Sequence, residues 1–346
     1  MSIYGSRTVK TVLLWQSLPM IISSMPVLTA IMDMLDRFRG CLLGAAAGDA
    51  LGMPTEGYTL YEIKSLFGQV RDMMQAPAGH FHTGLLAGQF TDDTEETLIL
   101  AESLIESFGF SPDRFADKLI AWGTAWTMDE RLNRGVGFAT RSAVESMIAG
   151  TPWQEAGHTI PTCGAAMRAA PIGLLYNFDL NIVKSYADLQ SLPTHCSAPA
   201  RAGAIAVAAG VALSLMGFPK LMILRNAASQ ASRVDVELAE RLLWVGTLLD
   251  LRPEEALGLI RNSPLASETV PAAFYCFLKF EPEDALIMAA SSGGDTDSIA
   301  SIAGSLFGAA CGASWIPKRW RDRLEQKERI ESDALSLYDL FNSFRC

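Results

Sequence analysis

The sequence predicts an all-α protein, because helical periodicity dominates it, alternating β-branched segments are nearly absent and several stretches consist of small residues. Apolar residues recur at helical spacing over most of the chain after residue 34. Runs of alternating β-branched residues, which are typical of half-buried strands, hardly occur. The predicted helices cover residues 35–51, 91–108, 112–126, 137–149, 163–175, 197–216, 234–249, 253–261, 269–279, 282–291, 297–312 and 331–344.

The first predicted helix, 35–51, carries glycines at positions 40, 44 and 48, spaced about one turn apart. Small residues at this spacing let two helix backbones approach closely. The helix ends in a loop broken by glycine and proline, which contains Glu56. A single glutamate in such a loop is usually solvated, so this pattern alone gives Glu56 no role.

Two later helices begin with acidic clusters about 200 residues apart, Thr91-Asp92-Asp93-Thr94 and Gly293-Gly294-Asp295-Thr296-Asp297-Ser298. Such residues are ordinary helix N-caps, and acidic side chains there complement the helix macrodipole. One cap needs one side chain, however, whereas each cluster offers several oxygen donors in a row. If the clusters meet, their carboxylates repel unless a divalent cation such as Mg²⁺, Mn²⁺ or Ca²⁺ lies between them. The pair therefore predicts a metal-dependent active site.

The intervening helices begin at weaker signals. Arg134-Gly135-Val136-Gly137 is a glycine turn whose backbone N–H groups could receive a phosphate, although such turns are common. Thr162-Cys163-Gly164 begins the helix at 163–175, and His195 precedes the helix at 197–216. That alanine-rich helix contains Arg201 and is interpreted as a buried core helix, in preference to a membrane span. From residue 234 onwards apolar periodicity alone predicts the helices, except for the one that begins with the second acidic cluster.

Composition limits the classes of function. The chain has 346 residues, 49% of them hydrophobic, and no polar linker divides it, so we expect one large domain. A net charge of −10 without a lysine or arginine run argues against a nucleic-acid-binding face. The six scattered cysteines form no C-x-x-C pair, and the four histidines form no zinc signature. Buried thiols in a reducing cytoplasm are the expectation.

The N-terminus admits three interpretations. Residues 11–32 are uncharged and mostly apolar, and they follow Arg7 and Lys10, as in a signal peptide or a weak membrane span. Pro19 and Pro26 argue against both. We favour an extension over residues 1–33 that carries no chemistry, followed by a single domain over 34–346.

Taken together and in order, these segments resemble the ADP-ribosylglycohydrolase family, which includes the dinitrogenase-reductase-activating glycohydrolases, the ADP-ribosyl-acceptor hydrolases and the J1 crystallins. The resemblance runs from about Asp36 to about Trp320, and the two acidic motifs are specific as a pair. It implies a compact single-domain orthogonal helical bundle with two Mg²⁺ or Mn²⁺ ions at the base of a cleft. The implied activity is hydrolysis of the C1″ glycosidic linkage between ADP-ribose and a modified acceptor.

The resemblance also assigns roles by position. It implies that Glu56 and Asp93 are the catalytic candidates. The implied substrate-binding residues lie around the pyrophosphate and the riboses and are Gly135, Val136, Gly137, Gly164 and His195. The implied metal ligands are Thr91, Asp92, Asp93, Asp295, Asp297 and Ser298.

Three positions depart from the family pattern. Ser298 stands where many members have threonine, and Cys163 stands where an asparagine usually precedes the glycine. Gly135 stands where the nitrogenase-regulating members place an acid, which weakens the case for an arginine-linked substrate. The linkage that is cleaved therefore stays open, as do the preferred metal, the oligomeric state and any regulatory partner.

Three alternatives remain at this point. The first is a non-catalytic, crystallin-like or ADP-ribose-binding protein with the same fold. The second is another metal-dependent hydrolase, such as a phosphoesterase that releases phosphate or AMP. The third is a membrane protein anchored through residues 11–32, which we do not expect.

Overall fold

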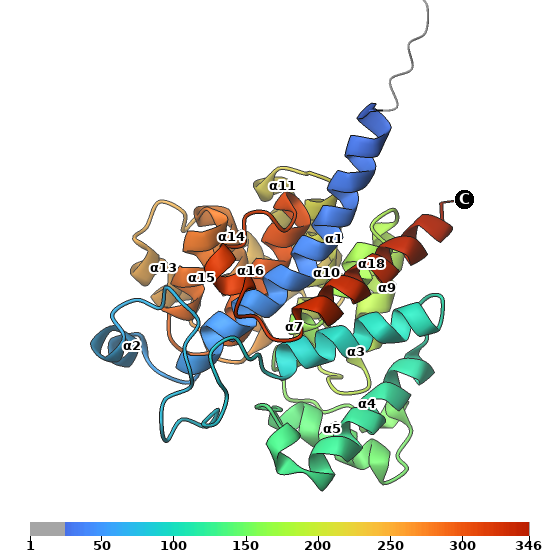
Figure 1. The fold of residues 1–346 in the computed structure, drawn as a ribbon, viewed down its shortest axis with the longest axis horizontal. Coiled ribbons are helices and arrows are strands. Elements are labelled where there is room, and N and C mark those ends of the chain that lie inside the picture. The colour runs from blue at the N-terminus through green and yellow to red at the C-terminus, as the bar shows by residue number, and fades with distance from the viewer. Residues whose placement is uncertain (1–24, 346) are drawn as a thin grey trace, which may run out of the picture.

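A computed structural model describes residues 25–345, with side chains from residue 33 onwards, and it has the all-α fold that the sequence predicts (Figure 1). The described residues contain no β-strand, and two isolated bridges, His158–His195 and Thr162–Leu265, join loops. Short 3₁₀ turns lie at η1 (Met53–Thr55) and η2 (Glu130–Leu132). The α-helices are α1 (Met25–Gly52), α2 (Leu60–Leu66), α3 (Asp92–Glu106), α4 (Pro112–Met128), α5 (Phe138–Ile148), α6 (Trp153–Ala156), α7 (Gly164–Met167), α8 (Ala170–Leu175), α9 (Leu180–Ser191), α10 (Ala198–Leu215), α11 (Lys220–Ala231), α12 (Val236–Val245), α13 (Pro253–Ile260), α14 (Ala266–Lys279), α15 (Pro282–Ala290), α16 (Thr296–Cys311), α17 (Lys318–Arg321) and α18 (Lys327–Ser343).

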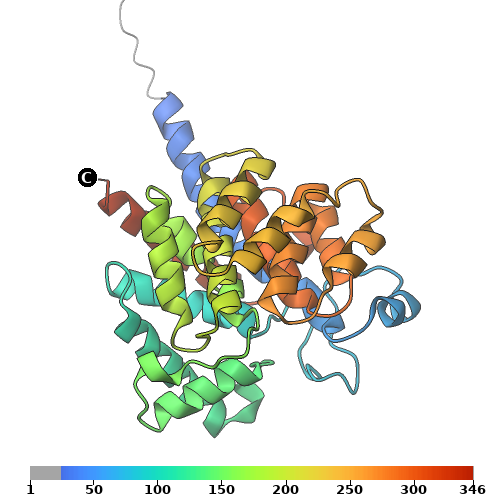
Figure 2. The same cartoon turned by 180° about the vertical axis from the view of Figure 1, so that it is seen from behind.

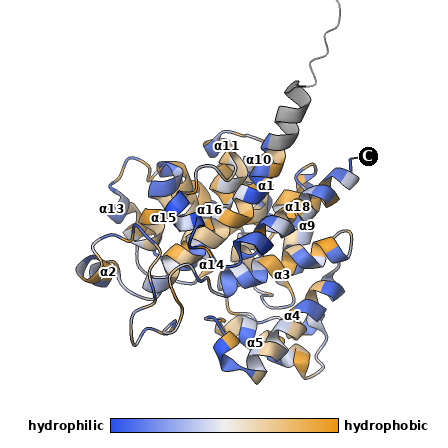
Figure 3. Ribbon diagram, in the orientation of Figure 1, coloured by the Kyte–Doolittle hydropathy of each residue, from blue (hydrophilic) through white to orange (hydrophobic). Residues whose placement is uncertain are grey.

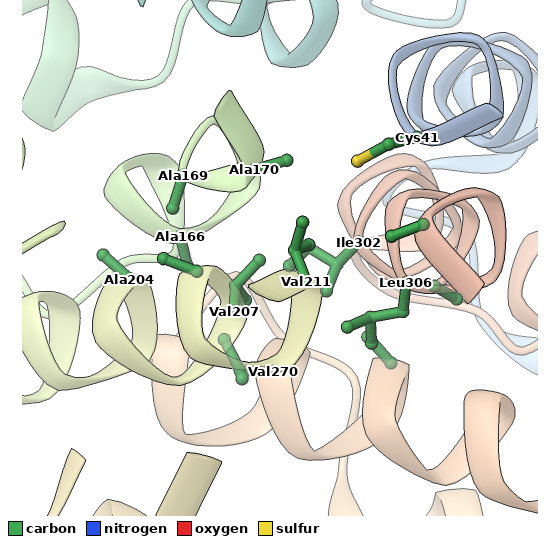
Figure 4. Packing of buried hydrophobic residues seen from close by; sticks show 14 of the residues in the cluster. Cys41, Ala166, Ala169, Ala170, Ala204, Val207, Val211, Val270, Ile302 and Leu306 are labelled. Carbon is green, nitrogen blue, oxygen red and sulfur yellow. The ribbon is translucent and has the colours of Figure 1, made fainter. Parts of the chain in front are cut away.

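Helix α10 lies at the centre of the core. Val207 and Val211 on this helix are fully buried, between α7 and α8 on one side and α14 and α16 on the other (Figure 4). Within the described part of the chain, only α10 is long and apolar enough to cross a membrane, and 83% of that stretch is buried inside the protein. This burial confirms the interpretation of α10 as a core helix.

Helices α1 and α16 pack with their backbones in direct contact, and they run side by side across the molecule (Figure 1). A Cβ atom added to Gly44 would lie 2.3 Å from the carbonyl oxygen of Gly304, and one added to Gly48 would lie 2.1 Å from that of Ala300. Since real Cβ atoms do not approach backbone so closely, only glycine fits at these positions. The predicted role of the glycine row in close helix packing is therefore confirmed.

The outer helices are amphipathic and enclose this pair. In Figure 3, α3 and α18 alternate polar and apolar residues along their length, as helices with one buried face do. Seen from behind, the segment from α9 to α14 covers the far side of α1 and α16 (Figure 2). The described helices thus form one packed body around α10 and α16.

The element boundaries differ from prediction in three respects. Helix α1 begins at Met25, ten residues before the predicted start, because a proline is tolerated in a first helical turn and no breaker follows before Gly40. The predicted helix at 163–175 is two short helices, α7 and α8, which break just before Pro171 because proline removes a backbone donor. The prediction contains no helix at α2, α6, α9, α11 or α17. Residues 1–24 of the predicted extension lie outside the described residues.

Candidate active site

The first acidic cluster is fixed to α1 by a buried carboxylate. Asp49, near the end of α1, accepts hydrogen bonds from the backbone N–H groups of Thr91 and Thr94, each at 3.0 Å. The hydroxyl groups of the same two threonines donate to it at 3.0 and 2.6 Å. Thr91 is also the N-cap of α3, since its oxygen accepts from the N–H of Asp93 at 3.3 Å. The threonines therefore hold the start of α3, while Asp92 and Asp93 remain for other partners.

The second cluster is shaped by two left-handed glycines. Gly293 and Gly294 have φ values of 82° and 75°, which favour glycine. The turn delivers Asp295 to the start of α16, where its N–H donates to the carbonyl oxygen of Asn262 at 2.7 Å. One carboxylate oxygen of Asp295 accepts from the Thr269 hydroxyl at 2.5 Å. Both glycines are required by the turn that carries the cluster.

The structure brings the two clusters together. The Thr91 hydroxyl lies 3.5 Å from a carboxylate oxygen of Asp297. One cavity of about 260 Å³ is lined by residues from both clusters and from the Glu56 loop, namely Glu56, Asp92, Asp93, Asp295, Asp297 and Ser298. The Oδ2 atom of Asp93 is buried and has no hydrogen-bond partner. Thr91, a predicted metal ligand, does not line this cavity, because its hydroxyl is bound to Asp49.

The charge balance of this cavity favours a cation. Burial raises the pKa values of Asp92, Asp93 and Asp297 well above the usual range, and mutual repulsion adds to the effect. Burial, followed by the nearby Asp295 carboxylate, raises the pKa of Glu56 in the same way. Divalent cations with oxygen preference would remove this repulsion and satisfy the unpartnered oxygen of Asp93. The donor set therefore fits such ions.

A histidine that the sequence analysis left without a role contacts Glu56 at the edge of the acidic cavity, although it does not line that cavity itself. The His82 Nε2 atom lies 2.6 Å from a carboxylate oxygen of Glu56. Ligand atoms of Glu56, His82 and Asp297 all lie within 4.8 Å of one another, a spacing that could hold one metal ion. No sequence signature identifies His82, because it lies 26 residues from Glu56 in an irregular loop.

The predicted substrate-binding residues lie along the other side of the cavity. Gly135, Gly137, Gly164 and His195 line it, whereas Val136 does not. Gly137 is the N-cap of α5, so the first turn of that helix directs backbone N–H groups into the same region. The adjoining Phe138 also lines the cavity, with 66% of its surface exposed.

His195 is held as a neutral side chain by a buried polar network. Its two ring nitrogens lie 2.8 Å from the Thr194 hydroxyl and 3.0 Å from the Thr162 hydroxyl. Burial, with the nearby Arg168, lowers the pKa of His195 to about 3. Arg168 also donates to Thr194 at 2.8 Å and forms a fully buried ion pair with Glu96. The network thus supports the wall of the cavity from behind.

Cys163, one of the departures from the family pattern, lies in the cavity wall. Its thiol is 3.1 Å from the Asp295 carboxylate and 3.6 Å from the Ser298 hydroxyl. Burial, with the carboxylates of Asp295 and Asp93, raises the pKa of this thiol well above its usual value. A neutral thiol therefore occupies the place of the family's usual amide.

Sequence reasoning missed several residues of this site. Thr162 and Thr269 each hold a predicted residue through one hydrogen bond between distant segments, and Asp49 holds Thr91 and Thr94 through several. Asp49 follows a glycine at the end of a patterned helix, so only a search for polar residues on an apolar face could have identified it. The other two lie at the starts of predicted helices, where a threonine is an ordinary N-cap.

Fold and site together define a helical protein in which two acidic helix starts meet at one enclosed cavity suited to divalent cations. The family model for ADP-ribosylglycohydrolases matches residues 31–345. The chain therefore belongs to the ADP-ribosylglycohydrolase family.

Individual relatives agree with this assignment. The chain is 39% identical to an uncharacterized protein of Archaeoglobus fulgidus over 89% of this chain and 97% of that one. It is 30% identical to bovine ADP-ribosylhydrolase ARH3, over 89% of this chain and 93% of the relative. It is 31% identical to ADP-ribosylarginine hydrolase Tri1 of Serratia proteamaculans, over 93% and 84%. A solved chain titled as an ADP-ribosylglycohydrolase-related protein complex superimposes with a TM-score of 0.74 at 30% identity, covering 89% of this chain and 99% of that chain.

Proposed function

We propose that the protein is a metal-dependent hydrolase that releases ADP-ribose from a modified acceptor by cleaving the C1″ glycosidic linkage. The observation that carries the proposal is the convergence of four buried aspartates and Glu56 on one cavity, beside a glycine turn. Family membership supports the same reaction class. Two relatives are named as an ADP-ribosylhydrolase and an ADP-ribosylarginine hydrolase.

The aspartates would hold two Mg²⁺ or Mn²⁺ ions, with Asp92 and Asp93 on one side and Asp295, Asp297 and Ser298 on the other. Bound there, such ions orient sugar hydroxyls and lower the pKa of a water molecule. In this proposal Thr91 is not itself a metal ligand, because its hydroxyl already donates to Asp49. It instead contacts Asp49 and Asp297 and helps to hold them in place.

Glu56 is the proposed acid and base. Its carboxyl group lies at the cavity wall, and burial raises its pKa well above the usual range. As the acid it would give a proton to the leaving acceptor, a contribution of about 10² to 10⁴-fold in rate. Asp93, which lines the same cavity, is the second candidate for accepting the proton of the attacking water.

The remaining cavity residues suit the rest of ADP-ribose. Gly135, Gly137 and the start of α5 can receive the pyrophosphate through backbone N–H groups. Gly164 and His195 adjoin the space for the ribose. Exposed Phe138 offers a face for adenine stacking at the cavity edge. A volume of about 260 Å³ encloses only part of so large a ligand, so the acceptor would extend into solvent.

The test is release of free ADP-ribose from arginine-, serine- and phosphate-linked substrates, with Mg²⁺ or Mn²⁺ and again with EDTA. We expect metal-dependent release from at least one linkage, and loss of release in Asp297→Asn. Release of AMP or phosphate would instead indicate a phosphoesterase. ADP-ribose binding without release from any substrate would favour the non-catalytic alternative, which the Cys163 departure keeps open.

We also propose a cytoplasmic location and a protein or small-molecule acceptor. The described cysteines, Cys41, Cys163, Cys196, Cys276 and Cys311, are all free thiols, which is consistent with a reducing compartment. Relatives with different printed names are equally similar, so identity does not select the acceptor. Cell fractionation tests the location, and the substrate panel tests the acceptor.

A further inference from the structure

The segment His80-Phe81-His82, in the loop before α3, contacts the Glu56–Gly57 turn at three points. The His80 Nε2 atom lies 2.7 Å from the backbone carbonyl oxygen of Glu56. The His82 Nε2 atom lies 2.6 Å from the Glu56 carboxylate. Between them, the Phe81 ring lies over Gly57, where an added Cβ would come within 3.1 Å of it. Backbone and side chain of Glu56 are therefore both held by one short segment.

Hydrogen bonding fixes the protonation pattern of the first histidine. The backbone N–H of His82 donates to the His80 Nδ1 atom at 3.2 Å, so Nδ1 is an acceptor. The proton of His80 then lies on Nε2, which donates to the Glu56 carbonyl oxygen. Burial lowers the pKa of His80, and it lowers that of His82 to about 4, so both rings are neutral near pH 7. The His80 contact is thus a directional hydrogen bond between defined groups, and a neutral His82 with its proton on Nε2 would donate to the Glu56 carboxyl group in the same way.

The other side of the His82 ring is in contact with the glycine turn of the proposed pyrophosphate site. A Cβ atom added to Gly135 would lie 2.3 Å from His82 Cε1, and Gly135 has a φ of 95°. The imidazole therefore occupies the space that a side chain at position 135 would need. In this chain an acidic residue at position 135 and an imidazole at position 82 exclude each other.

The backbone of the Glu56 loop is anchored on its opposite side as well. Gly57 N–H donates to the Gly294 carbonyl oxygen at 2.7 Å, and Gly294 N–H donates to the Tyr58 carbonyl oxygen at 2.8 Å. The loop is thereby joined to the second acidic cluster through backbone alone. The remaining freedom is that of the Glu56 side chain, which His82 restrains.

We propose that His82 is a positioning residue that orients the Glu56 carboxyl group over the acidic cavity, and that position 135 must be glycine because the His82 ring fills its side-chain space. The first part rests on the proposed role of Glu56 as acid and base. His80 and Phe81 hold the turn from which Glu56 extends. Hydrogen-bonding partners of this kind typically contribute about 10 to 100-fold in activity.

The kinetic test compares two replacements of the imidazole. His82→Gln keeps an N–H near the Nε2 position, and we expect it to retain kcat within about fivefold. His82→Phe keeps a ring without that nitrogen, and we expect kcat to fall by about 10 to 100-fold with little change in KM. Equal losses in both variants, or a loss confined to KM, would overturn the positioning role.

A double-mutant cycle separates positioning from a general effect on folding. If His82 acts through Glu56, adding His82→Phe to Glu56→Gln should cause no further loss of kcat. Mn²⁺ affinity, measured by calorimetry, should also be unchanged between Glu56→Gln and the double variant. A further loss in either quantity would reject the proposal, and a fall in Mn²⁺ affinity would identify His82 as a metal ligand instead.

Nitrogen NMR of the histidine rings tests the contact without any turnover. We expect Glu56→Gln to shift the His82 Nε2 resonance in the free protein and to leave that of His158 in place. An unchanged His82 resonance would refute the contact. This outcome is independent of the substrate panel, so failure of the proposed function and failure of the positioning contact are distinguishable.

Thermal unfolding tests the steric part of the proposal. Gly135→Ala should lower the Tm of the wild-type protein, and part of this loss should disappear in the His82→Ala background, because the clash is then removed. Gly137→Ala is the matched control, since no atom lies within 4 Å of its added Cβ. An equal loss from Gly135→Ala in both backgrounds would assign the need for glycine to its positive φ alone.

Discussion

Replacing Asp93 with asparagine should stabilise the protein without metal and remove most of its stabilisation by metal. The side chain is only 3% exposed, its Oδ2 atom has no hydrogen-bond partner, and its pKa is raised well above the usual range by burial and by Asp297. An unsatisfied buried polar group costs about 1–3 kcal/mol, and more if it is charged. Asparagine has nearly the same shape and stays polar but carries no charge, so in EDTA the variant should be more stable than wild type by the part of this cost that is due to the charge.

The metal-dependent part of the prediction has the opposite sign. A ligand present at 100 times its Kd stabilises the folded state by about 2.7 kcal/mol. For roughly 300 ordered residues the unfolding entropy is about 0.6 kcal/mol/K, so wild-type Tm should rise by about 4 °C. Asp93→Asn lacks one anionic ligand, and its rise should be below about 1 °C. The order of stability of the two proteins should therefore reverse between EDTA and saturating Mn²⁺.

Differential scanning calorimetry in EDTA, Mg²⁺ and Mn²⁺ measures both effects. Lowering the pH should reduce the advantage of the variant in EDTA, because a carboxyl group with a raised folded-state pKa destabilises the fold only above the unfolded-state value of 3.8. Asp284→Asn, in the exposed first turn of α15, is the matched control and should show neither effect. If Asp93→Asn is less stable than wild type in EDTA and keeps the full metal shift, the carboxylate is a structural cap and the reasoning is refuted.

Three further predictions concern stability. Arg168→Met leaves Glu96 as an uncompensated buried charge and should lower the free energy of unfolding in urea by about 3–5 kcal/mol. The double variant with Glu96→Leu should recover most of this loss. No recovery would mean that the hydrogen bonds of Arg168 to Gln190 and Thr194 dominate. Gly44→Ala places a Cβ 2.3 Å from a backbone oxygen and should lower the free energy of unfolding by about 2–3 kcal/mol. Gly258→Ala, in open space on α13, is the control and should raise it by up to about 1 kcal/mol. Similar effects of both substitutions would contradict the close helix contact. Burial raises the pKa of Asp333 to about 6, so this group should lower stability progressively as pH rises from about 4 to 6. Asp333→Asn should make the decline of stability over this range smaller, with a gain of about 1 kcal/mol at pH 7, reduced from the full linkage value because the group is partly exposed. A pH profile of unfolding that is the same in both proteins would contradict this assignment.

The acidic clusters could be predicted because their chemistry is local in sequence. Three consecutive oxygen donors at a helix start exceed what a cap requires, and this excess is visible in Thr91-Asp92-Asp93 without a structure. Helix existence was predictable for the same reason, since 3.6-residue periodicity lies within one segment. The structure accordingly confirms the all-α fold and brings Asp93 and Asp297 to one cavity.

The supporting residues were not predictable, because their roles depend on long-range packing. His82 contacts Glu56 and the 135 turn only after three loops have been placed together. Helix α2 carries a local signal, a capping box between Thr59 and Glu62. The helix is only seven residues long, however, which is too short for its periodicity to predict it. Helix α9 has an equally local N-cap, Asp179, whose side chain accepts from the N–H of Asn181, so this helix also carried a signal within its own segment.

The glycine contact between α1 and α16 has a consequence for how the site can change. Asp49 lies on one of these helices and Asp297 on the other, so the relative position of the two clusters depends on how the helices are aligned. A slip of one helical turn along the contact would displace the clusters by about 5.4 Å, more than a metal–oxygen bond. Substitutions around the cavity can therefore alter what is bound while the alignment persists, whereas a single inserted residue between Gly40 and Asp49 would rotate the glycine row out of the contact and dismantle the site at once. This part of the chain therefore has to keep its length as well as its glycines.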